Sequence, residues 1–382
     1  MLGPGILSST VLSTGTMTFT ILMPSAGTFT LPIEAGGDNY YHNFTVTWGD
    51  TSSSTITSYN DVDRTHTYAS SGSKTITMTG RCEYFNFNAG GDCALVTAIT
   101  GFTNDIGFEN LSFNGCYNLT STVALGTKAS LRNTQGLFSG CSSLASLPAN
   151  LLDGCVNTTT LYYAFQGCTT ITTVPSNLFR YNTEVTDFGH VFDSCTSLLS
   201  TNFANMFDYN TKAIDFQGAF YYCPLVTAIP TNFFRYNTAA VYFFQTFRNC
   251  QALASVGSDV FRYNTAATNF AYTFADIISA SLTSLPTDLF RYNVLADAFY
   301  DCFYQCTGLG NSALVNLFKY NVNAGGMSET FANINAGNLT ALPNDLFKYI
   351  SNEPGIGAYV GERVSRNFKN IGADGKAFDE LR

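Results

Sequence analysis

Apolar positions along the chain repeat with a period of about 27 residues, far longer than the period of a helix or a strand. One anchor of the repeat is a phenylalanine inside the phrase N-L-F-R-Y-N or a variant of it. A second anchor is the pattern F-x-x-C, and a third is an apolar stretch that ends in proline, such as S-L-A-S-L-P. Three anchors in constant phase over about nine copies predict an array of stacked coils. The first anchor falls at Phe179, Phe207, Phe234, Phe261, Phe290, Phe318 and Phe347.

Each coil is expected to contain one short strand and one or two helical turns. Apolar and polar residues alternate in S-L-x-x-L-P, as in a strand with one buried face, and the proline ends it because it cannot donate to a ladder. The Asn or Asp before L-F is a fair helix N-cap. The spacing of Phe188 and Phe192 places both rings on one face of a second helical turn. Stacked coils would pair their strands in a continuous parallel sheet, so the predicted class is β-rich with short helices.

The phrase L-F-R-Y-N is interpreted mainly as a structural part needed once per coil. Leu178 and Phe179 are expected in the core, Tyr181 is expected to be half-buried, and Arg180 is expected to face solvent. A row of basic residues beside a row of tyrosines is either a solvated face or a surface that grips a carbohydrate or an anionic polymer. Asp208 breaks the basic row. The candidate binding surface consists of Arg180, Tyr181, Arg235, Tyr236, Arg262, Tyr263, Arg291, Tyr292, Lys319 and Tyr320.

The chain has 11 cysteines, and most of them fall in the F-x-x-C register. Because their spacing equals the repeat, they would occupy the same place in successive coils, where a small buried residue packs well. Ile277 and Ile334 replace cysteine in two copies, which favours packing over disulfide pairing. Cys302 and Cys306 are four residues apart with no histidine beside them, so no metal site is expected.

The units L-F-S-G-C-S-S-L-A-S-L-P, A-F-Q-G-C-T-T-I-T-T-V-P-S-N-L-F-R-Y-N and F-R-N-C-Q-A-L-A-S-V resemble BspA-type leucine-rich repeats. Such repeats occur in surface proteins of bacteria and some protists and in phage proteins. The resemblance covers roughly residues 93 to 350. It implies a leucine-rich-repeat solenoid of about nine coils and a role in adhesion or binding, and it brings no catalytic residues with it.

The first 80 residues have a different pattern, with Thr, Val and Ile alternating around Gly72 as in two strands joined by a turn. The stretch Trp48-Gly49-Asp50 and the segment T-H-T-Y-A-S-S-G-S-K-T-I-T-M-T-G resemble a PKD-type β-sandwich, although Thr51 stands where that family has a second glycine. The resemblance implies a spacer or docking module. His66 is then expected to be a strand residue and Asp50 a turn residue.

Three regions are therefore predicted: a PKD-like β-sandwich at 1–80, the repeat solenoid at 81–350, and a C-terminal cap or docking tail at 351–382. Pro354 and two nearby glycines interrupt the repeat pattern, and charged residues are denser in the tail than before it. The tail is read either as a polar cap, which solenoids require, or as a peptide that docks on a partner.

Composition limits the possible functions. Charged residues are only 12% of the chain and the net charge is -9, so no basic stripe exists for a nucleic acid. No apolar run is long enough to span a bilayer, and the N-terminus lacks the pattern of a secretory signal. No catalytic motif, cofactor motif or repeating carboxylate pair is present, so no enzyme and no cofactor are expected.

Two functions remain open from the sequence, and a third, an enzyme that acts on glycans, is kept only because solenoids often bind sugars. The first is a phage virion surface component, such as a head or tail decoration or a fibre-associated protein. Its partners would be other virion proteins and a host-surface glycan or protein. The second is a bacterial cell-surface adhesin of the BspA-like kind. Formation of a homo-oligomer is left open.

Overall fold

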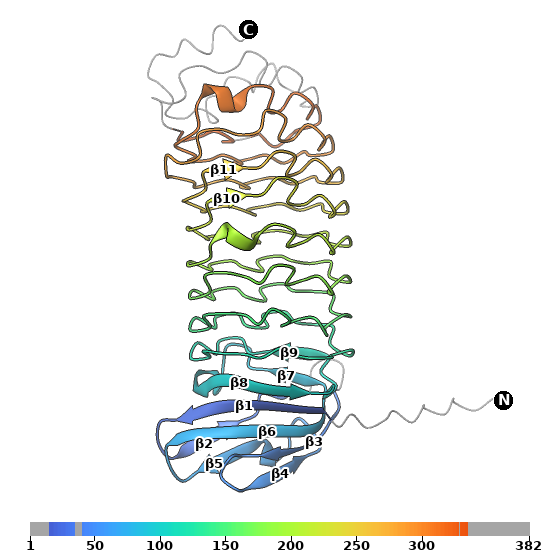
Figure 1. Cartoon of the computed structure of the whole chain (residues 1–382), viewed down its shortest axis with the longest axis vertical. Coiled ribbons are helices and arrows are strands. Elements are labelled where there is room, and N and C mark those ends of the chain that lie inside the picture. The colour runs from blue at the N-terminus through green and yellow to red at the C-terminus, as the bar shows by residue number, and fades with distance from the viewer. Residues whose placement is uncertain (1–14, 35–39, 328, 335–382) are drawn as a thin grey trace, which may run out of the picture.

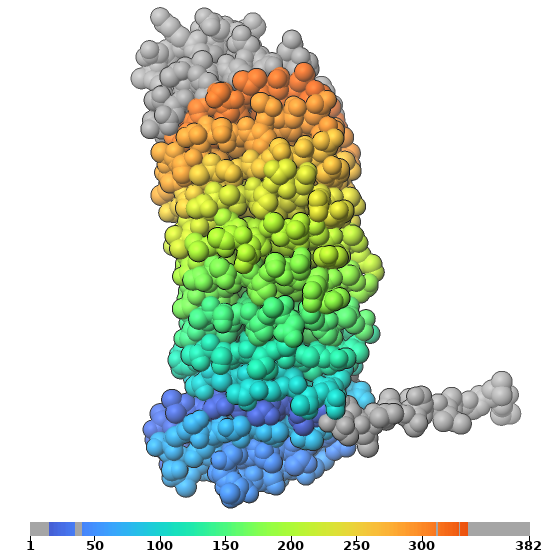
Figure 2. Space-filling view, in the orientation of Figure 1, coloured from blue at the N-terminus to red at the C-terminus, as the bar shows by residue number. Residues whose placement is uncertain are grey.

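The computed structural model describes residues 15–34, 40–327 and 329–334. The predicted tail at 351–382 and the copy of the repeated phrase at Phe347 lie outside the described residues. Figure 1 shows two parts arranged along one axis, with β-sheets formed by the N-terminal residues at one end and a column of flat coils above them. The space-filling view shows the same column with no gap between successive coils (Figure 2).

The N-terminal part contains two antiparallel sheets. The larger has the strand order β4-β3-β6-β1-β8, and the smaller pairs β2 with β5. Along β1 every second residue from Met17 to Met23 is buried, as expected of a strand with one face in a core. The rings of Phe19 in β1 and Phe29 in β2 lie 6.0 Å apart, so the two sheets share one core. The strands are β1 (Gly15–Met23), β2 (Gly27–Thr30), β3 (His42–Thr47), β4 (Ser53–Ile56), β5 (Thr65–Tyr68), β6 (Gly72–Cys82) and β8 (Val96–Thr103).

Asp50 and His66 take the positions expected from the sequence. His66 lies in β5, where its ring stacks on Trp48 at 4.9 Å and its Nε2 lies 2.7 Å from Asp50 Oδ2. Asp50 lies in the turn between β3 and β4, and the Ser52 hydroxyl, which donates to its carboxylate, is the main cause that lowers the pKa of Asp50 to about 2. Thr51 has a positive φ of 75°, a conformation that glycine adopts more readily than threonine.

Strand β8 joins the N-terminal sheet to the coils. It comes from residues 96–103, which the sequence analysis assigned to the repeats, yet it pairs with β1 and also forms a parallel bridge from Ala98 to Ser121. Beside it, β7 (Tyr84–Asn86) pairs in parallel with β9 (Asn110–Ser112). The five-stranded sheet, of which β8 is the last strand, therefore covers the first coil and protects its apolar end from water.

Successive coils are joined by one parallel bridge per coil and by a set of backbone hydrogen bonds. The amides of Phe188, His190, Phe192 and Ser194 donate to carbonyls of the next coil at 2.7 to 2.9 Å. The same four bonds recur in neighbouring coils, so backbone groups are satisfied without long strands. We call the bridging positions the bridge row: Asn110, Asn133, Thr160, Asp187, Asp215, Tyr242, Asn269, Ala298 and Gly326.

A column of phenylalanine rings runs through the centre of the coils. Phe220 lies between Phe192 and Phe247, with ring centroids 5.7 and 5.5 Å away and planes within 22° of parallel. These three residues are the phenylalanines of successive F-x-x-C copies, so the rings lie one above another as an array of stacked coils requires. The column continues with similar spacing in both directions, through Phe85, Phe113, Phe138, Phe165, Phe274, Phe303 and Phe331.

The predicted helical turns are wrong. The described residues contain four short 3₁₀ helices, η1 (Val62–Arg64), η2 (Cys93–Leu95), η3 (Ser200–Asn202) and η4 (Asn311–Leu314), and the repeated phrase forms consecutive turns instead. Asn177 is not a helix N-cap: its φ is +60°, in the left-handed region. Asn and Asp tolerate this region better than other residues with a side chain, which explains why they occupy this position. His190 and Ser194 also have positive φ, so the segment of Phe188 and Phe192 cannot continue as a helix.

The predicted continuous sheet of S-L-x-x-L-P strands is also wrong. In this part of the coils the described residues contain one strand pair, β10 (Ala228–Ile229) with β11 (Ser255–Val256). Each of these two strands has only two residues, because tight turns lie on either side of it. The regular pairing lies at the bridge row instead.

The asparagine that ends the repeated phrase forms a buried ladder that the sequence analysis did not anticipate. The Asn237 side-chain amide donates to the carbonyls of Phe207 and Asn210 in the preceding coil, at 3.0 and 2.9 Å. Equivalent pairs of bonds recur in six coils, and each asparagine is at most 1% exposed. We call these residues the asparagine ladder: Asn182, Asn210, Asn237, Asn264, Asn293 and Asn321.

All 11 cysteines are buried and unpaired. The Cys195 thiol donates to the Phe165 carbonyl of the preceding coil at 3.1 Å, and Cys168 and Cys223 make the equivalent contacts. Burial raises the pKa of Cys195 well above its usual value, so the group stays a neutral thiol. The structure agrees with the packing role predicted for these residues.

Replacing Cys195 by Ala is expected to lower the free energy of unfolding by about 1–2 kcal/mol, because a buried sulfur and its contacts are lost. Denaturant titration of the variant measures this change. As a matched test, native-state thiol labelling of the wild type should leave Cys141, Cys168, Cys195, Cys223 and Cys250 unmodified. Disulfides between these residues in the native protein would contradict the packing role.

Candidate binding surfaces

The predicted candidate residues come together as one continuous row on the outside of the coils, which we call the Arg/Tyr row. The guanidinium of Arg262 lies over the rings of Tyr263 and Tyr292, at 5.6 and 5.1 Å from their centres. Arg291 lies in the same way between Tyr292 and Tyr320. In this part of the row, cations and aromatic rings therefore alternate from one coil to the next. The row consists of Arg180, Tyr181, Tyr209, Arg235, Tyr236, Arg262, Tyr263, Arg291, Tyr292, Lys319 and Tyr320.

Tyrosine rings form the accessible part of the row. Tyr181 is 48% exposed and Tyr263 is 43% exposed, in agreement with the expected half-buried position. Tyr209 belongs to the row although the sequence analysis left it out, because its phrase has Asp208 in place of a basic residue; it is 52% exposed. Regular exposure of one aromatic ring per coil gives a flat, repeating surface.

Each arginine of the row is paired with an aspartate. Asp208 does not interrupt the row but lies 2.7 Å from the Arg235 guanidinium, and Asp153 lies 2.8 Å from Arg180. Arg262 and Arg291 pair with aspartates three residues earlier in the chain, Asp259 and Asp288. Such exposed pairs add little to stability, but they cancel most of the positive charge. An anionic polymer therefore finds less attraction here than the basic residues alone suggested.

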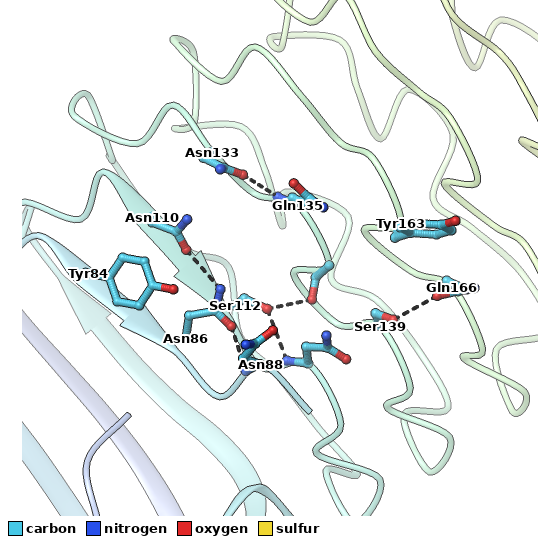
Figure 3. Close-up of a pocket in the computed structure, with 12 residues that line it drawn as sticks. Tyr84, Asn86, Asn88, Asn110, Ser112, Asn133, Gln135, Ser139, Tyr163 and Gln166 are labelled. Atoms are coloured by element: carbon cyan, nitrogen blue, oxygen red, sulfur yellow. Dashed lines mark hydrogen bonds between the residues drawn. The ribbon is translucent and has the colours of Figure 1, made fainter. Parts of the chain in front are cut away.

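A polar groove opens near the N-terminal end of the coils, and sequence reasoning did not identify it. Its volume is about 320 Å³, and all the residues that line it are Asn, Gln, Ser, Tyr or Gly. Figure 3 shows these side chains spread over successive coils, from Tyr84 and Asn110 on one side to Tyr163 and Gln166 on the other. The one sequence signal that could have pointed to it is the density of asparagines between residues 86 and 133.

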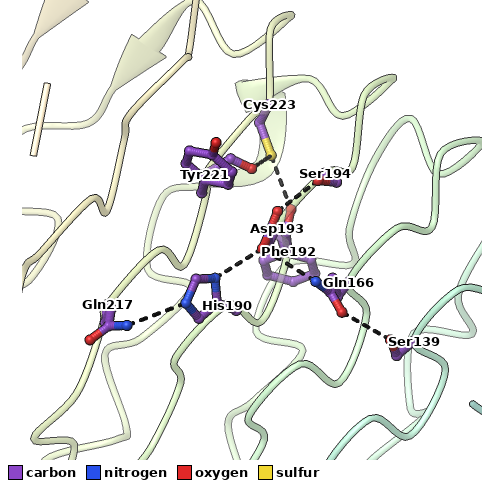
Figure 4. A network of polar contacts seen from close by, with 9 residues as sticks. All are labelled: Ser139, Gln166, His190, Phe192, Asp193, Ser194, Gln217, Tyr221 and Cys223. Atoms are coloured by element: carbon purple, nitrogen blue, oxygen red, sulfur yellow. Dashed lines mark hydrogen bonds and ion pairs between the residues drawn. The ribbon is translucent and has the colours of Figure 1, made fainter. Parts of the chain in front are cut away.

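A hydrogen-bond network extends from the end of this groove into the next coils (Figure 4). The Ser139 hydroxyl donates to Gln166 Oε1 at 3.1 Å, and the Gln166 amide donates to the Asp193 carboxylate at 3.4 Å. His190 Nδ1 lies 2.9 Å from the same carboxylate, and Ser194 donates to its other oxygen at 2.7 Å. The network fixes the orientation of Gln166 at the groove. Among the described residues, no group of three His, Cys, Asp or Glu side chains is arranged to hold a metal ion.

Two carboxylates at neighbouring positions of the bridge row have raised pKa values. Burial is the main cause for both Asp187 and Asp215, and the charge of Asp187 raises the pKa of Asp215 further. Each carboxylate accepts one backbone hydrogen bond, from Gly189 and Gln217, which opposes the shift only in part. The folded state therefore favours the protonated form of both groups relative to the unfolded chain.

Asp215→Asn is expected to stabilise the protein at pH 7. A carboxyl group whose pKa is higher in the folded state stabilises the protein at pH values below its unfolded pKa, and this stabilisation is lost as the pH rises through its folded pKa. The wild type therefore has no such stabilisation at pH 7. Asparagine keeps the bond from the backbone N–H of Gln217 and carries no charge. The difference in melting temperature between Asp215→Asn and the wild type, measured from pH 3 to pH 8, should become smaller towards acid pH. Asp297→Asn, at an exposed aspartate, is the control, and an equal gap at every pH would contradict the assignment.

Comparison with known proteins gives limited information. Neither a family model nor a curated protein matches the chain. Among solved structures, the chain is similar to a leucine-rich repeat protein from Bacteroides ovatus, with 16% identity and a TM-score of 0.14 over 57% of this chain and 72% of that one. At this TM-score we base no argument on the similarity. No helix in the described part of the chain has the length and apolar character needed to cross a membrane.

Proposed function

We propose that this protein is a non-enzymatic binding protein whose coils form a leucine-rich-repeat solenoid that presents the Arg/Tyr row to an extended partner. The observation that carries the proposal is the alternation of guanidinium groups and exposed tyrosine rings over successive coils, as in Arg262 between Tyr263 and Tyr292. Ring faces suit the apolar faces of sugars, and paired arginines still offer N–H donors to hydroxyl groups. A host-surface glycan is the partner that this chemistry favours.

The setting we propose is the surface of a phage virion. All cysteines are buried and unpaired, which favours folding in a reducing compartment, and a phage protein leaves its host by lysis. The motif resemblances to BspA-type repeats and to a PKD-type β-sandwich support a surface protein. The N-terminal sheets and residues 351–382 are the non-repeating parts, so we assign contacts with other virion proteins to them. A bacterial cell-surface adhesin is the alternative.

Two measurements test this proposal. Mass spectrometry of purified particles should detect the chain, and capsid and tail genes should lie beside its gene; a gene among cell-surface anchoring genes would favour the adhesin. Purified protein incubated with a polysaccharide that it binds should leave the chain length unchanged. Shortening of the polysaccharide, followed by size-exclusion chromatography, would overturn the non-enzymatic proposal.

Deletion of residues 351–382 is expected to leave the coils folded, because most anchors of the repeat lie before them, and to reduce incorporation into particles. Circular dichroism and the amount of chain in purified particles measure the two effects. Normal incorporation of the truncated protein would assign particle attachment to the N-terminal sheets instead.

A further inference from the structure

We propose that the polar groove is a second binding site, separate from the Arg/Tyr row, and that it takes a short neutral carbohydrate of one or two sugar rings. Its volume of about 320 Å³ is at the lower end of the range for ligand pockets, about 300–1,000 Å³. The groove lies on the bridge-row side of the coils, whereas the Arg/Tyr row is formed by the repeated phrase. Binding at one surface therefore need not involve the other.

The lining determines the class of ligand. No charged side chain faces the groove, so an acidic sugar or a phosphate finds no countercharge there. No aliphatic side chain faces it either, so an extended peptide finds no pocket for its apolar side chains. Carboxamides and hydroxyls each offer both donors and acceptors, which matches a ligand covered with hydroxyl groups.

Some carboxamides in the groove are held in place and others are available. Asn133 Oδ1 accepts a bond from the backbone N–H of Gln135, and Gln166 is fixed by Ser139 and Asp193. Among the described residues, no hydrogen bond engages the side chains of Asn88 or Gln135 or the side-chain amide of Asn114, a partly exposed residue of the lining. The fixed groups hold the shape of the groove, and the free donors and acceptors are available to a ligand, although ordering these free side chains costs part of the binding energy.

Tyr163 marks one end of the groove in an unfavourable backbone conformation. Its φ is +57°, a region that is sparsely populated by bulky residues, and its ring packs against His190 at 4.8 Å. The neighbouring coil has Gly136 at the equivalent position. A tyrosine held in this conformation beside the groove gives a ring face for the apolar side of a sugar.

Gly136 creates the depth of the groove. A Cβ added there would meet Ser139 and Asn114 at 3.6 to 3.8 Å, which is ordinary contact, so a side chain can be placed there without a clash at its first atom. Gly218, at the same position three coils further on, differs because the His190 ring already fills that space, 2.5 Å from an added Cβ. A side chain at Gly136 would therefore occupy the groove without disturbing its walls.

The test uses the full chain with cellobiose, maltose, lactose and N,N′-diacetylchitobiose as probes and sialyllactose as the acidic comparison. Saturation-transfer NMR should detect at least one neutral disaccharide, with sialyllactose bound more weakly. Gly136→Asn, which tolerates the positive φ, should weaken binding at least about tenfold. Gln245→Asn, at the equivalent position in a coil outside the groove, is the matched control and should bind like the wild type.

Tyr163→Asn provides a second variant if Gly136→Asn does not fold, and it should also weaken binding at least about tenfold. Absence of signal from every neutral disaccharide would overturn the proposal, as would unchanged binding in both groove variants. Because the Arg/Tyr row is intact in these variants, binding of a long polysaccharide by the row would survive. Failure of this proposal can therefore be told apart from failure of the proposed function.

Discussion

Replacing Asn237 by Ala is expected to lower the free energy of unfolding by about 2–5 kcal/mol. The side chain is fully buried and donates to the carbonyls of Phe207 and Asn210. Alanine removes both bonds and leaves a cavity, and each lost buried bond costs about 1–3 kcal/mol. The sum stays below its upper limit because each carbonyl keeps one backbone bond, from Asn210 N and Ala213 N. Guanidinium titration measures the change. Hydrogen exchange should show that amides of the flanking coils lose protection first, because coils contact mainly their neighbours.

Tyr236→Ala is the control within the same phrase. Tyr236 is 46% exposed, so its replacement should change the free energy of unfolding by about 0.5 kcal/mol, as for most surface sites. Equal losses for the two variants would contradict the view that the phrase has one inward-facing and one outward-facing part.

Phe220→Ala is expected to cost about 3–5 kcal/mol, the usual range for removing a large buried ring. Phe220 is fully buried between Phe192 and Phe247, and it also packs against Phe203 at 4.8 Å. The cavity cannot close easily because the hydrogen bonds between coils fix their spacing. Denaturant titration measures the loss.

Phe220→Leu should recover a large part of that loss, since it keeps most of the apolar volume. Phe244→Ala, at a partly exposed ring near the bridge row, should cost much less. A small effect of Phe220→Ala would mean that the ring column does not hold the coils together.

The arrangement of the buried rings could be predicted from the sequence because it depends on a regular signal. Phe192, Phe220 and Phe247 keep a constant phase, and stacking is the simplest way to bury residues that recur in this way. The buried cysteines followed from the same phase, as did the exposed tyrosines.

The local backbone could not be predicted in the same way. The short apolar patterns in each coil fit a helical turn as well as a series of tight turns, and the positive φ at Asn177 and His190 decides between them. Asparagine is common at caps, in turns and in buried ladders, so Asn182 alone does not reveal which role it has. Hydrogen bonds between coils settle that role, and they depend on the three-dimensional stack.

The two candidate surfaces also differ in whether the sequence could predict them. The Arg/Tyr row was visible because it repeats with the phrase, although its charge balance depends on partners such as Asp153, which lies outside the phrase. The polar groove arises where the repeat is irregular: Phe113 follows the bridge residue Asn110 by three positions, whereas Phe138 follows Asn133 by five. An exception to the period carries no repeated signal, so the groove appeared only in the structure.

The most direct test of binding through the Arg/Tyr row is affinity electrophoresis of a triple variant, Tyr236→Ala, Tyr263→Ala and Tyr292→Ala. Gels would contain dextran, mannan, xylan or bacterial capsular polysaccharides, and Tyr117→Ala, Tyr222→Ala and Tyr242→Ala would form the control, because these tyrosines are equally exposed but lie outside the row. We predict that at least one polysaccharide retards the wild type and the control but not the row variant, with the free energies of unfolding within about 1.5 kcal/mol of each other. Equal retardation of the row variant, or no retardation of the wild type by any of these polysaccharides, would contradict the account.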